Sequence, residues 1–524
     1  MVIFMKTTIN KSEIISEEPL GFVLSESTVI GIPIAFFAGE HEIISREEEL
    51  VVIYDFHHEN APLILGVLRY IRRLEPFLRR YQRVSIIDFP EAIDNVEKLP
   101  YTNGVVIPLA ELIIDPNDSE SIIRIERNVT YVPFPGSKVY RIKHGDVLTT
   151  LLSNLLPRNI EPLILGFHKY AEKLEIPLDP RYIPYHIGVF GATGMGKSRL
   201  VKVLIDEIIN KTDYAVIVFD HTGMDYATFY PDSTMESLKI KLDPITFSSW
   251  LAKKLRLSEY LVDYVDIASL EIYRDYSVAG WHDLVSKIIN PDMEEDKSFL
   301  MEQLHGRLKS KITSVASRLG AKDTTIQKMS ILMDILVSSE ELARTFAREY
   351  DAQEILDIAF QYKKENKPLV IDLSLEDTIE AKRSVIASVI EAAWNRIMKT
   401  RQPLNLIIAV DEAQNYTWRA GRCEESLTRI AREGRKWGFG LIIASQRLAG
   451  SISTDIRANL NTVLFSKLSQ TGDLNEIKQF ADITGIDQSN LAQLVPREFY
   501  VAGLMNPLRK PIAIRVKEVK LLGE

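Results

Sequence analysis

The stretch His186-Ile-Gly-Val-Phe-Gly-Ala-Thr-Gly-Met-Gly-Lys-Ser198 decides the fold of this chain. A short apolar run that ends at Phe190 precedes a glycine-rich loop, and an apolar helical segment follows as far as Asn210. This is the G-x-x-x-x-G-K-[ST] pattern between a strand and a helix, which is typical of a phosphate-binding loop. A plain glycine-rich turn is the alternative, and the flanking strand and helix patterns argue against it.

The residue types in this loop suit the phosphates of ATP. Its glycines allow the backbone to turn N–H groups toward phosphate oxygens, and the N-terminus of the following helix adds a favourable dipole. Lys197 is expected to reach the β- and γ-phosphates, and Ser198 to hold Mg²⁺. The residues predicted to bind the nucleotide are Gly191, Ala192, Thr193, Gly194, Met195, Gly196, Lys197, Ser198 and Arg199.

Length and composition limit the alternatives. A chain of 524 residues that is 46% apolar can form two or three domains with a sizeable core. No stretch approaches the roughly 18 apolar residues of a membrane span, so we expect a cytoplasmic protein without a membrane partner. The single Cys423 excludes an internal disulfide framework and a multi-cysteine zinc site. The net charge of −9 excludes a basic coat for nucleic acid, but not a ring with a basic channel.

Residues 1–150 contain short β-rich runs separated by charged or turn-forming segments, which predicts a small N-terminal β-barrel or sandwich. The runs are Gly21–Leu24, Ile32–Phe37, Leu50–Tyr54, Leu63–Leu68, Val84–Ile87, Gly104–Ile107 and Ser121–Ile125. The prolines in Tyr131–Tyr140 predict an extended connector. The cluster of Asp55, His57, His58 and Glu59 admits a metal site, but a solvated hairpin loop is favoured because no other residues with ligand spacing reinforce it.

From residue 151 onward the pattern predicts an α/β fold, a doubly wound P-loop sheet with a helical insertion. The expected strands, whose unbroken apolar character suits a sheet covered on both faces, are His186–Phe190, Ala215–Phe219, Leu369–Leu373, Leu406–Val410, Leu441–Ala444 and Val463–Ser466. A helix over 376–400 should pack on the sheet through a stripe that includes Ile386 and Trp394. Residues 245–367 read as charged amphipathic helices, and residues 505–524 as a C-terminal strand and tail.

Three further motifs complete a predicted hydrolysis site. An apolar strand ends in Asp411-Glu412, where Asp411 would bind Mg²⁺ and Glu412 would deprotonate the attacking water; a strand-end salt bridge is the alternative. Gln446 follows another strand and is placed to sense the γ-phosphate. Arg435 is placed to act as an arginine finger in a neighbour's site. A solvated, basic helix end formed by Arg432, Arg435 and Lys436 remains equally open from spacing alone.

In these motifs the chain resembles the HerA family of hexameric DNA-translocating ATPases, within the HerA/FtsK superfamily. The resemblance covers nearly the whole chain. It rests on Gly21–Val23, Ile64–Ile71, Pro133–Val139, His186–Ser198, Asp411–Gln414, Glu433–Lys436 and Ala444–Gln446. Two departures stand out. The run Asp220-His-Thr-Gly-Met-Asp225-Tyr226 replaces the family's usual Gly-Glu-Tyr, and Met195 replaces a small residue inside the loop.

The resemblance implies a RecA-like ATPase core in which Glu412 is the catalytic base, Gln446 the sensor and Arg435 the trans-acting finger, with Arg432 as the second choice. It also implies a homo-hexamer that moves duplex DNA through its central channel. Its N-terminal barrel would dock a NurA-type nuclease for DNA end resection and repair. The loop after Asp411-Glu412 and the loop after the next strand offer candidate DNA contacts, namely Trp418, Arg419, Arg422 and Arg447.

Alternatives stay open at the level of sequence. For the loop that carries Trp418, an ordinary exposed loop is the favoured interpretation, because two arginines make a small patch. A related motor for conjugative DNA transfer, genome packaging or phage defence would carry the same motifs. A P-loop kinase or an NTP-gated scaffold is the third class, which Glu412 and Arg435 disfavour because neither class needs these residues.

Overall fold

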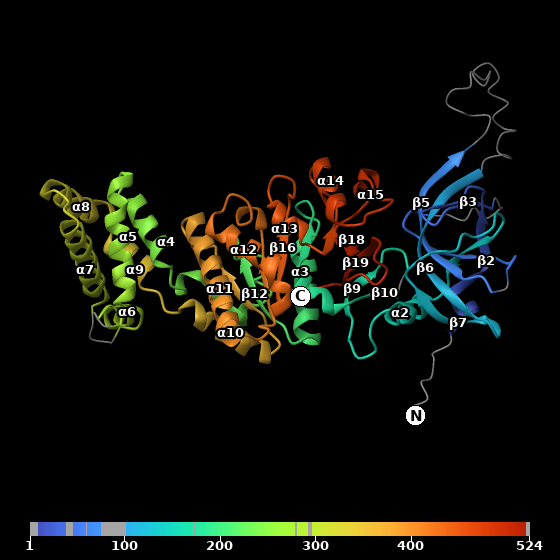
Figure 1. Cartoon of the computed structure of the whole chain (residues 1–524), viewed down its shortest axis with the longest axis horizontal. Helices are drawn as coiled ribbons and strands as arrows, with labels where there is room; N and C mark the ends of the chain where they lie inside the picture. Colours follow the sequence, from blue (N-terminus) through green and yellow to red (C-terminus); the bar gives the residue numbers. More distant parts are fainter. Residues whose placement is uncertain are drawn as a thin grey trace, which may run out of the picture. The chain divides into compact units, whose positions relative to one another are not determined.

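The computed structural model describes residues 9–37, 46–58, 60–74, 101–171, 173–277, 280–291 and 296–519 (Figure 1). These residues fall into two compact units. Unit 1 consists of the chain as far as Thr212, together with Gln446–Ala449 and the segment that begins at Ala458. Unit 2 consists of Asp213–Ser445 and Gly450–Arg457.

The N-terminal part of unit 1 is an antiparallel sheet, drawn in blue and cyan in Figure 1. Its strands are β1 (Ile9–Asn10), β2 (Ile15–Val23), β3 (Ile32–Phe36), β4 (Leu50–Tyr54), β5 (Leu63–Leu74), β6 (Tyr101–Asp115), β7 (Asp118–Glu126) and β8 (Lys138–Ile142), with the short helix α1 (Lys11–Ile14) after β1. The strand order is β1-β7-β6-β3-β2-β8-β4-β5. β5 also pairs with β6. Six strands therefore form a closed circuit of pairings, in the order β6, β3, β2, β8, β4 and β5.

The predicted β-rich runs coincide with these strands wherever the structure describes them. The strands β2 to β7 overlap, in order, the runs that start at Gly21, Ile32, Leu50, Leu63, Gly104 and Ser121. The run Val84–Ile87 lies outside the described residues. Buried side chains such as Ile34, Ile53, Ile64 and Val106 fill one core, because alternate residues of each strand point to the same face.

One prediction for this region was wrong in part. His57 and His58 are exposed, as a solvated loop requires, and Glu59 lies outside the described residues. Asp55, however, is not solvated, since only 1% of its surface is exposed. One carboxylate oxygen accepts hydrogen bonds from the Tyr131 hydroxyl at 2.5 Å and the Phe134 amide at 3.0 Å. The other accepts from the His57 amide at 3.0 Å. Burial by itself would raise the pKa of Asp55, but these bonds outweigh it and lower the pKa, so Asp55 is an ionised anchor for the connector.

The rest of unit 1 carries a second set of strands in the order β10-β9-β19-β18-β17-β11. The elements are α2 (Gly145–Ser153), β9 (Leu163–His168), β10 (Glu175–Leu178), β11 (Ile187–Phe190), α3 (Lys197–Lys211), β17 (Thr462–Phe465), α14 (Thr471–Phe480), α15 (Gln488–Ala492), β18 (Glu498–Gly503) and β19 (Ile512–Val516). β11 and β17 are parallel, whereas the other neighbours are antiparallel. Every residue of β11 and β17 is buried, as their apolar sequences predicted.

A buried ion pair ties the N-terminal sheet to the C-terminal part of unit 1. Arg69 on β5 donates to both carboxylate oxygens of Glu48, at 2.9 and 3.1 Å. The same guanidinium donates to the carbonyl oxygens of Thr484 at 2.6 Å and Pro511 at 3.2 Å. Because a buried charge must be paired and hydrogen-bonded to offset its desolvation, these bonds fix how the two parts of unit 1 meet.

Unit 2 is built on a parallel sheet in the order β16-β15-β12-β14-β13. Its strands are β12 (Ala215–Asp220), β13 (Thr234–Glu236), β14 (Leu369–Asp372), β15 (Leu406–Val410) and β16 (Phe439–Ser445). The helices that alternate with these strands from β13 onward include α10 (Ala352–Lys364), α11 (Ile379–Thr400), α12 (Arg422–Glu433) and α13 (Thr454–Ala458). The predicted stripe of α11 is confirmed, since Ile386, Ile390, Trp394 and Ile397 are all buried. The helix begins later than predicted because the Thr378 side chain caps it.

The helical insertion of unit 2 has its own core. It comprises α4 (Pro244–Lys254), α5 (Glu259–Arg274), α6 (Trp281–Ile289), α7 (Lys297–Arg318), α8 (Asp323–Leu336) and α9 (Ser339–Phe346), grouped together in yellow-green in Figure 1. Phe247, Val265, Leu308 and Phe346 are among the buried residues that pack together there. Amphipathic periodicity therefore predicted the insertion correctly as helical. Among the described residues, none of the helices is both long enough and apolar enough to cross a membrane.

Candidate active site

The loop between β11 and α3 has the backbone geometry of an anion cradle. Gly194 and Gly196 have φ values of +81° and +89°, a region that residues with a Cβ rarely adopt. A Cβ at Gly194 would meet nothing within 4 Å, so backbone conformation rather than space requires glycine there. Gly196 is also the N-cap of α3 and supplies no side-chain bond, which leaves the first N–H groups of the helix available to an anion.

Two C-terminal segments of unit 1 hold this loop in place. The Ala192 amide donates to the Lys467 carbonyl at 2.7 Å, and the Arg497 amide donates to the Met195 carbonyl at 2.9 Å. Met195 itself is buried, and the Lys197 ammonium donates to the Gly191 carbonyl at 2.9 Å. The sequence analysis did not single out Lys467 or Arg497. Only the distant strand ends that carry them, after β17 and before β18, bring them to the loop.

The predicted sensor lies against the loop. The Thr193 hydroxyl donates to the side-chain oxygen of Gln446 at 2.7 Å, and both residues belong to unit 1. A side-chain amide in contact with a phosphate-binding loop can respond to whether a γ-phosphate is present. The sensing role of Gln446 stays a prediction that this contact supports.

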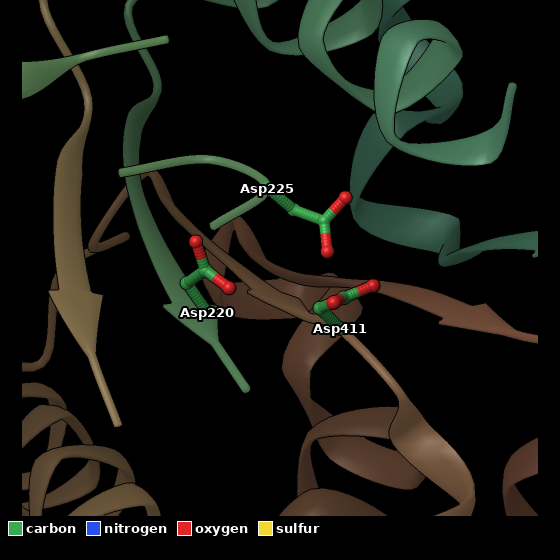
Figure 2. Close-up of side chains that lie close together, drawn as sticks. All are labelled: Asp220, Asp225 and Asp411. Atoms are coloured by element: carbon green, nitrogen blue, oxygen red, sulfur yellow. The ribbon is translucent and has the colours of Figure 1, made fainter. Parts of the chain in front are cut away.

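In unit 2, three aspartates meet at neighbouring strand ends. β12 and β15 are parallel with Phe219 opposite Val410, so Asp220 and Asp411 follow at the same edge. Figure 2 shows these two side chains close to Asp225, which comes from the loop after β12. One carboxylate oxygen from each residue lies within 4.8 Å of the others. The sequence placed Asp411 here but could not place Asp225, since no periodic pattern covers its loop.

The three carboxylates differ in what they already bind. Asp220 is fully buried and accepts four backbone hydrogen bonds, two on each oxygen. Their donors are the amides of Thr222 at 3.1 Å, Gly223 at 3.0 Å, Tyr226 at 2.8 Å and Ala227 at 3.0 Å. Asp220 therefore shapes the loop that carries Asp225. Asp225 and Asp411 are the two carboxylates better placed to take a cation.

The electrostatics of this cluster fit a divalent cation. Burial, and then the negative charges of Asp225, Glu412 and Asp220, raise the pKa of Asp411 to about 8. A bound cation would reverse this shift, because a nearby positive charge favours the ionised carboxyl group. Carboxylate oxygens are the ligands that Mg²⁺ prefers. The carboxylates of Asp225 and Asp411 in unit 2 therefore fit Mg²⁺, and Asp411 is the ligand that the sequence predicted there. Ser198, in unit 1, stays a predicted ligand.

Glu412 is held by a residue to which the sequence analysis gave no role. Its backbone is left-handed, with φ +44°, which is uncommon for a non-glycine residue and concentrates at functional sites. The Gln414 side-chain amide donates to a carboxylate oxygen of Glu412. The Gln414 oxygen in turn accepts from the Ser445 hydroxyl at 2.6 Å. The amide is thus fixed in one orientation, with its donor toward Glu412.

The two candidate finger residues have different surroundings. Arg432, near the end of α12, forms an ion pair with Asp455 at 2.7 Å. Arg435 lies on the 3₁₀ turn η7 (Gly434–Trp437) and is exposed. Gly434 permits this turn, because a Cβ there would lie 2.2 Å from the Phe439 carbonyl oxygen. Arg432 and Arg435 are both exposed, so both stay candidates, and the finger role itself stays a prediction.

The predicted DNA contacts also differ among themselves. Trp418 is 36% exposed, and the Arg419 guanidinium lies 5.9 Å from the centre of its ring. Arg422 instead pairs with Asp243 at 2.8 Å and with Glu391, so much of its charge is already offset within unit 2. Arg447, in unit 1, is exposed. The structure thus leaves Trp418 and Arg419 as the better candidates of the first loop, and contact with DNA stays a prediction.

A family model described as "Helicase HerA, central domain" matches residues 163–393. These residues are thus similar to the central domain of HerA helicases. A "DNA double-strand break repair helicase HerA" from Sulfolobus acidocaldarius is 27% identical over 379 residues, covering 67% of this chain and 68% of the relative. One of the same description from Pyrococcus furiosus is 22% identical over 519 residues, covering 89% and 87%. The solved VirB4 structure of Thermoanaerobacter pseudethanolicus is 14% identical, with a TM-score of 0.44, covering 70% of this chain and 98% of that one.

The HerA match makes the chain a P-loop ATPase of the helicase type. The matched residues include the whole P-loop and Asp225, and they end before Asp411. The roles of Asp411, Glu412, Arg435 and Gln446 therefore rest on their own motifs and on the contacts described above.

Proposed function

We propose that this HerA-type chain binds ATP with Mg²⁺ at Gly191–Arg199 and hydrolyses it. The observation that carries the proposal is the cradle itself, with its left-handed glycines and the uncapped start of α3. Lys197 would hold the β- and γ-phosphates. Ser198 and Asp411 would hold the Mg²⁺ ion, which supplies positive charge to the phosphate oxygens when bound.

Glu412 would take a proton from the attacking water as the water oxygen bonds to the γ-phosphorus. The bond between the γ-phosphorus and the bridging oxygen breaks, and ADP leaves with that oxygen. Gln414 supports this role, since its amide fixes a carboxylate oxygen of Glu412. Gln446 would report the γ-phosphate to the loop through Thr193.

The active form would be a homo-hexamer in which Arg435 of one subunit completes the site of its neighbour. The exposed position of Arg435 on η7 supports this role, and Arg432, which is also exposed and pairs with Asp455, is the second choice. A guanidinium supplied in trans offsets the charge that builds up on the transferred phosphoryl group. ATP turnover would then depend on assembly.

The motor would translocate duplex DNA through the centre of the ring, using the loop at Trp418–Arg422 and Arg447. Relatives named DNA double-strand break repair helicases support a role in DNA end processing. A NurA-type nuclease would dock on residues 1–150, taken as a barrel. Residues 151–524 would form the RecA-like core, with the insertion at 245–367 and the C-terminal strand and tail at 505–524.

The test combines assembly with DNA-dependent turnover. ATPase rate is measured with and without duplex DNA, and particle mass by native mass spectrometry in the same buffer. We expect a hexamer whose rate rises several-fold with duplex DNA. A monomer with full turnover, or a rate indifferent to DNA, would contradict the ring translocase.

A further inference from the structure

The helical insertion holds a strongly basic segment in an acidic chain. Residues 303–333, in α7 and α8, contain six lysines and arginines and a single acidic residue, whereas the whole chain has a net charge of −9. The six cations are Arg307, Lys309, Lys311, Arg318, Lys322 and Lys328. Such a local excess of one sign creates a field that attracts a polyanion.

The segment folds into a helical hairpin whose tip is exposed. α7 ends at Arg318 and α8 begins at Asp323, with Gly320 at φ +77° permitting the turn. We call residues 314–328 the α7–α8 tip. Its exposed side chains are cationic or hydroxyl-bearing for the most part: Ser314, Ser317, Arg318, Lys322, Thr324 and Lys328.

Neighbouring carboxylates offset only part of this charge. Lys309 pairs with Asp334 at 2.7 Å, while Lys311 and Arg318 share Glu271 at 2.9 and 2.6 Å. Six cations against Glu271, Glu302, Asp323 and Asp334 leave a local charge of +2. Across the residues that the structure describes, Lys322 and Lys328 have no ion-pair partner, and both are exposed.

The chemistry of the tip distinguishes among polyanions. Residues 303–333 contain no phenylalanine, tyrosine or tryptophan, so they cannot stack the bases of a single strand. Lysines, an arginine and hydroxyl groups instead suit the phosphates of a duplex, which such side chains bind without reading sequence. In addition, the N-cap Lys322 gives α8 no side-chain cap, and the positive end of the helix dipole favours an anion at this end.

We propose that the α7–α8 tip binds the phosphate backbone of duplex DNA, as a contact of unit 2 separate from the loop at Trp418. The inference rests on the proposed function, because it assumes that duplex DNA is the substrate. The tip would be a second contact with the DNA backbone, one that does not read base sequence and uses no residue of the nucleotide site. Loss of the tip should therefore weaken DNA binding and leave ATP hydrolysis without DNA unchanged.

The test uses the full chain with Lys322→Glu and Lys328→Glu combined. Duplex DNA affinity is measured by fluorescence anisotropy at several salt concentrations, with a non-hydrolysable ATP analogue present. We expect affinity at least about tenfold weaker, and a slope of log affinity against log salt smaller by about 1.8, which is the loss of two phosphate contacts. The milder Lys322→Gln and Lys328→Gln variant should fall between this variant and wild type.

The matched control is Lys364→Glu and Lys399→Glu, on α10 and α11 of the same unit, where both lysines are exposed. It makes the same change in net charge away from the tip and should bind DNA as wild type does. If the tip and control variants bind DNA equally, the inference is overturned while the proposed function stands. If wild type itself binds no duplex DNA, both are overturned. Circular dichroism and basal ATPase rate confirm that each variant is folded.

Discussion

The backbone amide of Arg497 donates a hydrogen bond to the carbonyl oxygen of Met195, inside the phosphate-binding loop, at 2.9 Å. Arg497 makes this bond with a left-handed backbone, at φ +74°. Its guanidinium donates to the Val516 carbonyl at 2.9 Å and to Glu518 at 3.1 Å. Arg497, which directly precedes β18, thus fixes one side of the phosphate-binding loop while its own backbone is in a strained conformation.

The effect of replacing Arg497 on ATP binding should therefore depend on whether the new residue can adopt the left-handed backbone. Arg497→Val puts a β-branched side chain in the left-handed region, which costs on the order of 1–2 kcal/mol and displaces the amide that holds Met195. We expect ATP affinity to fall about tenfold in this variant. Arg497→Gly is the control, because glycine adopts the same φ freely and should keep affinity near wild type. Equal losses in the two variants would show that the guanidinium, not the backbone, matters.

Gln414 should act on turnover rather than on binding. Gln414→Leu keeps the size of the side chain but removes the amide that orients Glu412 and the bond between that amide and Ser445. We predict a kcat lower by about tenfold or more, with KM for ATP little changed. Ser445→Ala, which removes only the outer bond, should lower kcat less. A rise in KM at constant kcat would refute a positioning role for Gln414.

Arg435 and Arg432 are separated by a mixing experiment. Arg435→Ala subunits and Glu412→Gln subunits, each inactive alone, should regain hydrolysis when mixed, because an Arg435→Ala subunit keeps its own Glu412 and receives Arg435 from a Glu412→Gln neighbour. Arg432→Ala subunits should hydrolyse ATP without a second variant, since Arg432 pairs with Asp455 in its own chain. Failure of the Arg435→Ala mixture to regain hydrolysis would exclude Arg435 as the trans-acting finger.

The buried His168 makes unit 1 sensitive to acid. Burial lowers the pKa of its imidazole to about 3. In the unfolded chain this imidazole has a pKa near 6.5 and takes up a proton that it does not bind in the folded chain. The unfolding free energy therefore falls as the pH drops below about 6.5. Asparagine at this position keeps an acceptor for the Tyr170 amide. Between pH 7 and pH 5, His168→Asn should lose about 2 kcal/mol less unfolding free energy than wild type does.

Urea unfolding at the two pH values measures this difference. If wild type and His168→Asn lose the same stability, His168 is not the group that resists protonation. A second expectation guards against a general packing effect, because above pH 7 the stability difference between the two proteins should stop changing with pH.

Sequence predicted the parts of this structure that local pattern specifies. The loop from Gly191 to Gly196 was evident from its glycines, and the core strands and α11 from periodicity, because burial on a sheet or along a helix stripe leaves a repeating apolar signal. Prediction from sequence failed where contacts between distant segments of the chain determine the surroundings of a residue. Asp55 looked solvated because its partners, Tyr131 and Phe134, lie more than 70 residues away along the chain.

The candidate site shows the same division. Asp411, Glu412 and Gln446 end strands or follow them directly, so strand prediction placed them. Asp225 joins the acidic cluster only because Asp220 folds its loop back with four backbone bonds. The pairing of β17 with β18 brings Arg497 to the loop. The run Asp220–Tyr226, which stands where the family has Gly-Glu-Tyr, was the one signal that pointed to Asp225.

The central claim is that Glu412 activates the water that cleaves ATP bound in the glycine cradle. Glu412→Gln keeps the shape of the side chain and one acceptor oxygen for the Gln414 amide but removes the base. The decisive measurement is single-turnover ATP hydrolysis beside ATP binding in the same preparation. We predict unchanged binding with hydrolysis slower by about 10²–10⁴-fold. Binding that is intact together with hydrolysis at the wild-type rate would contradict the account.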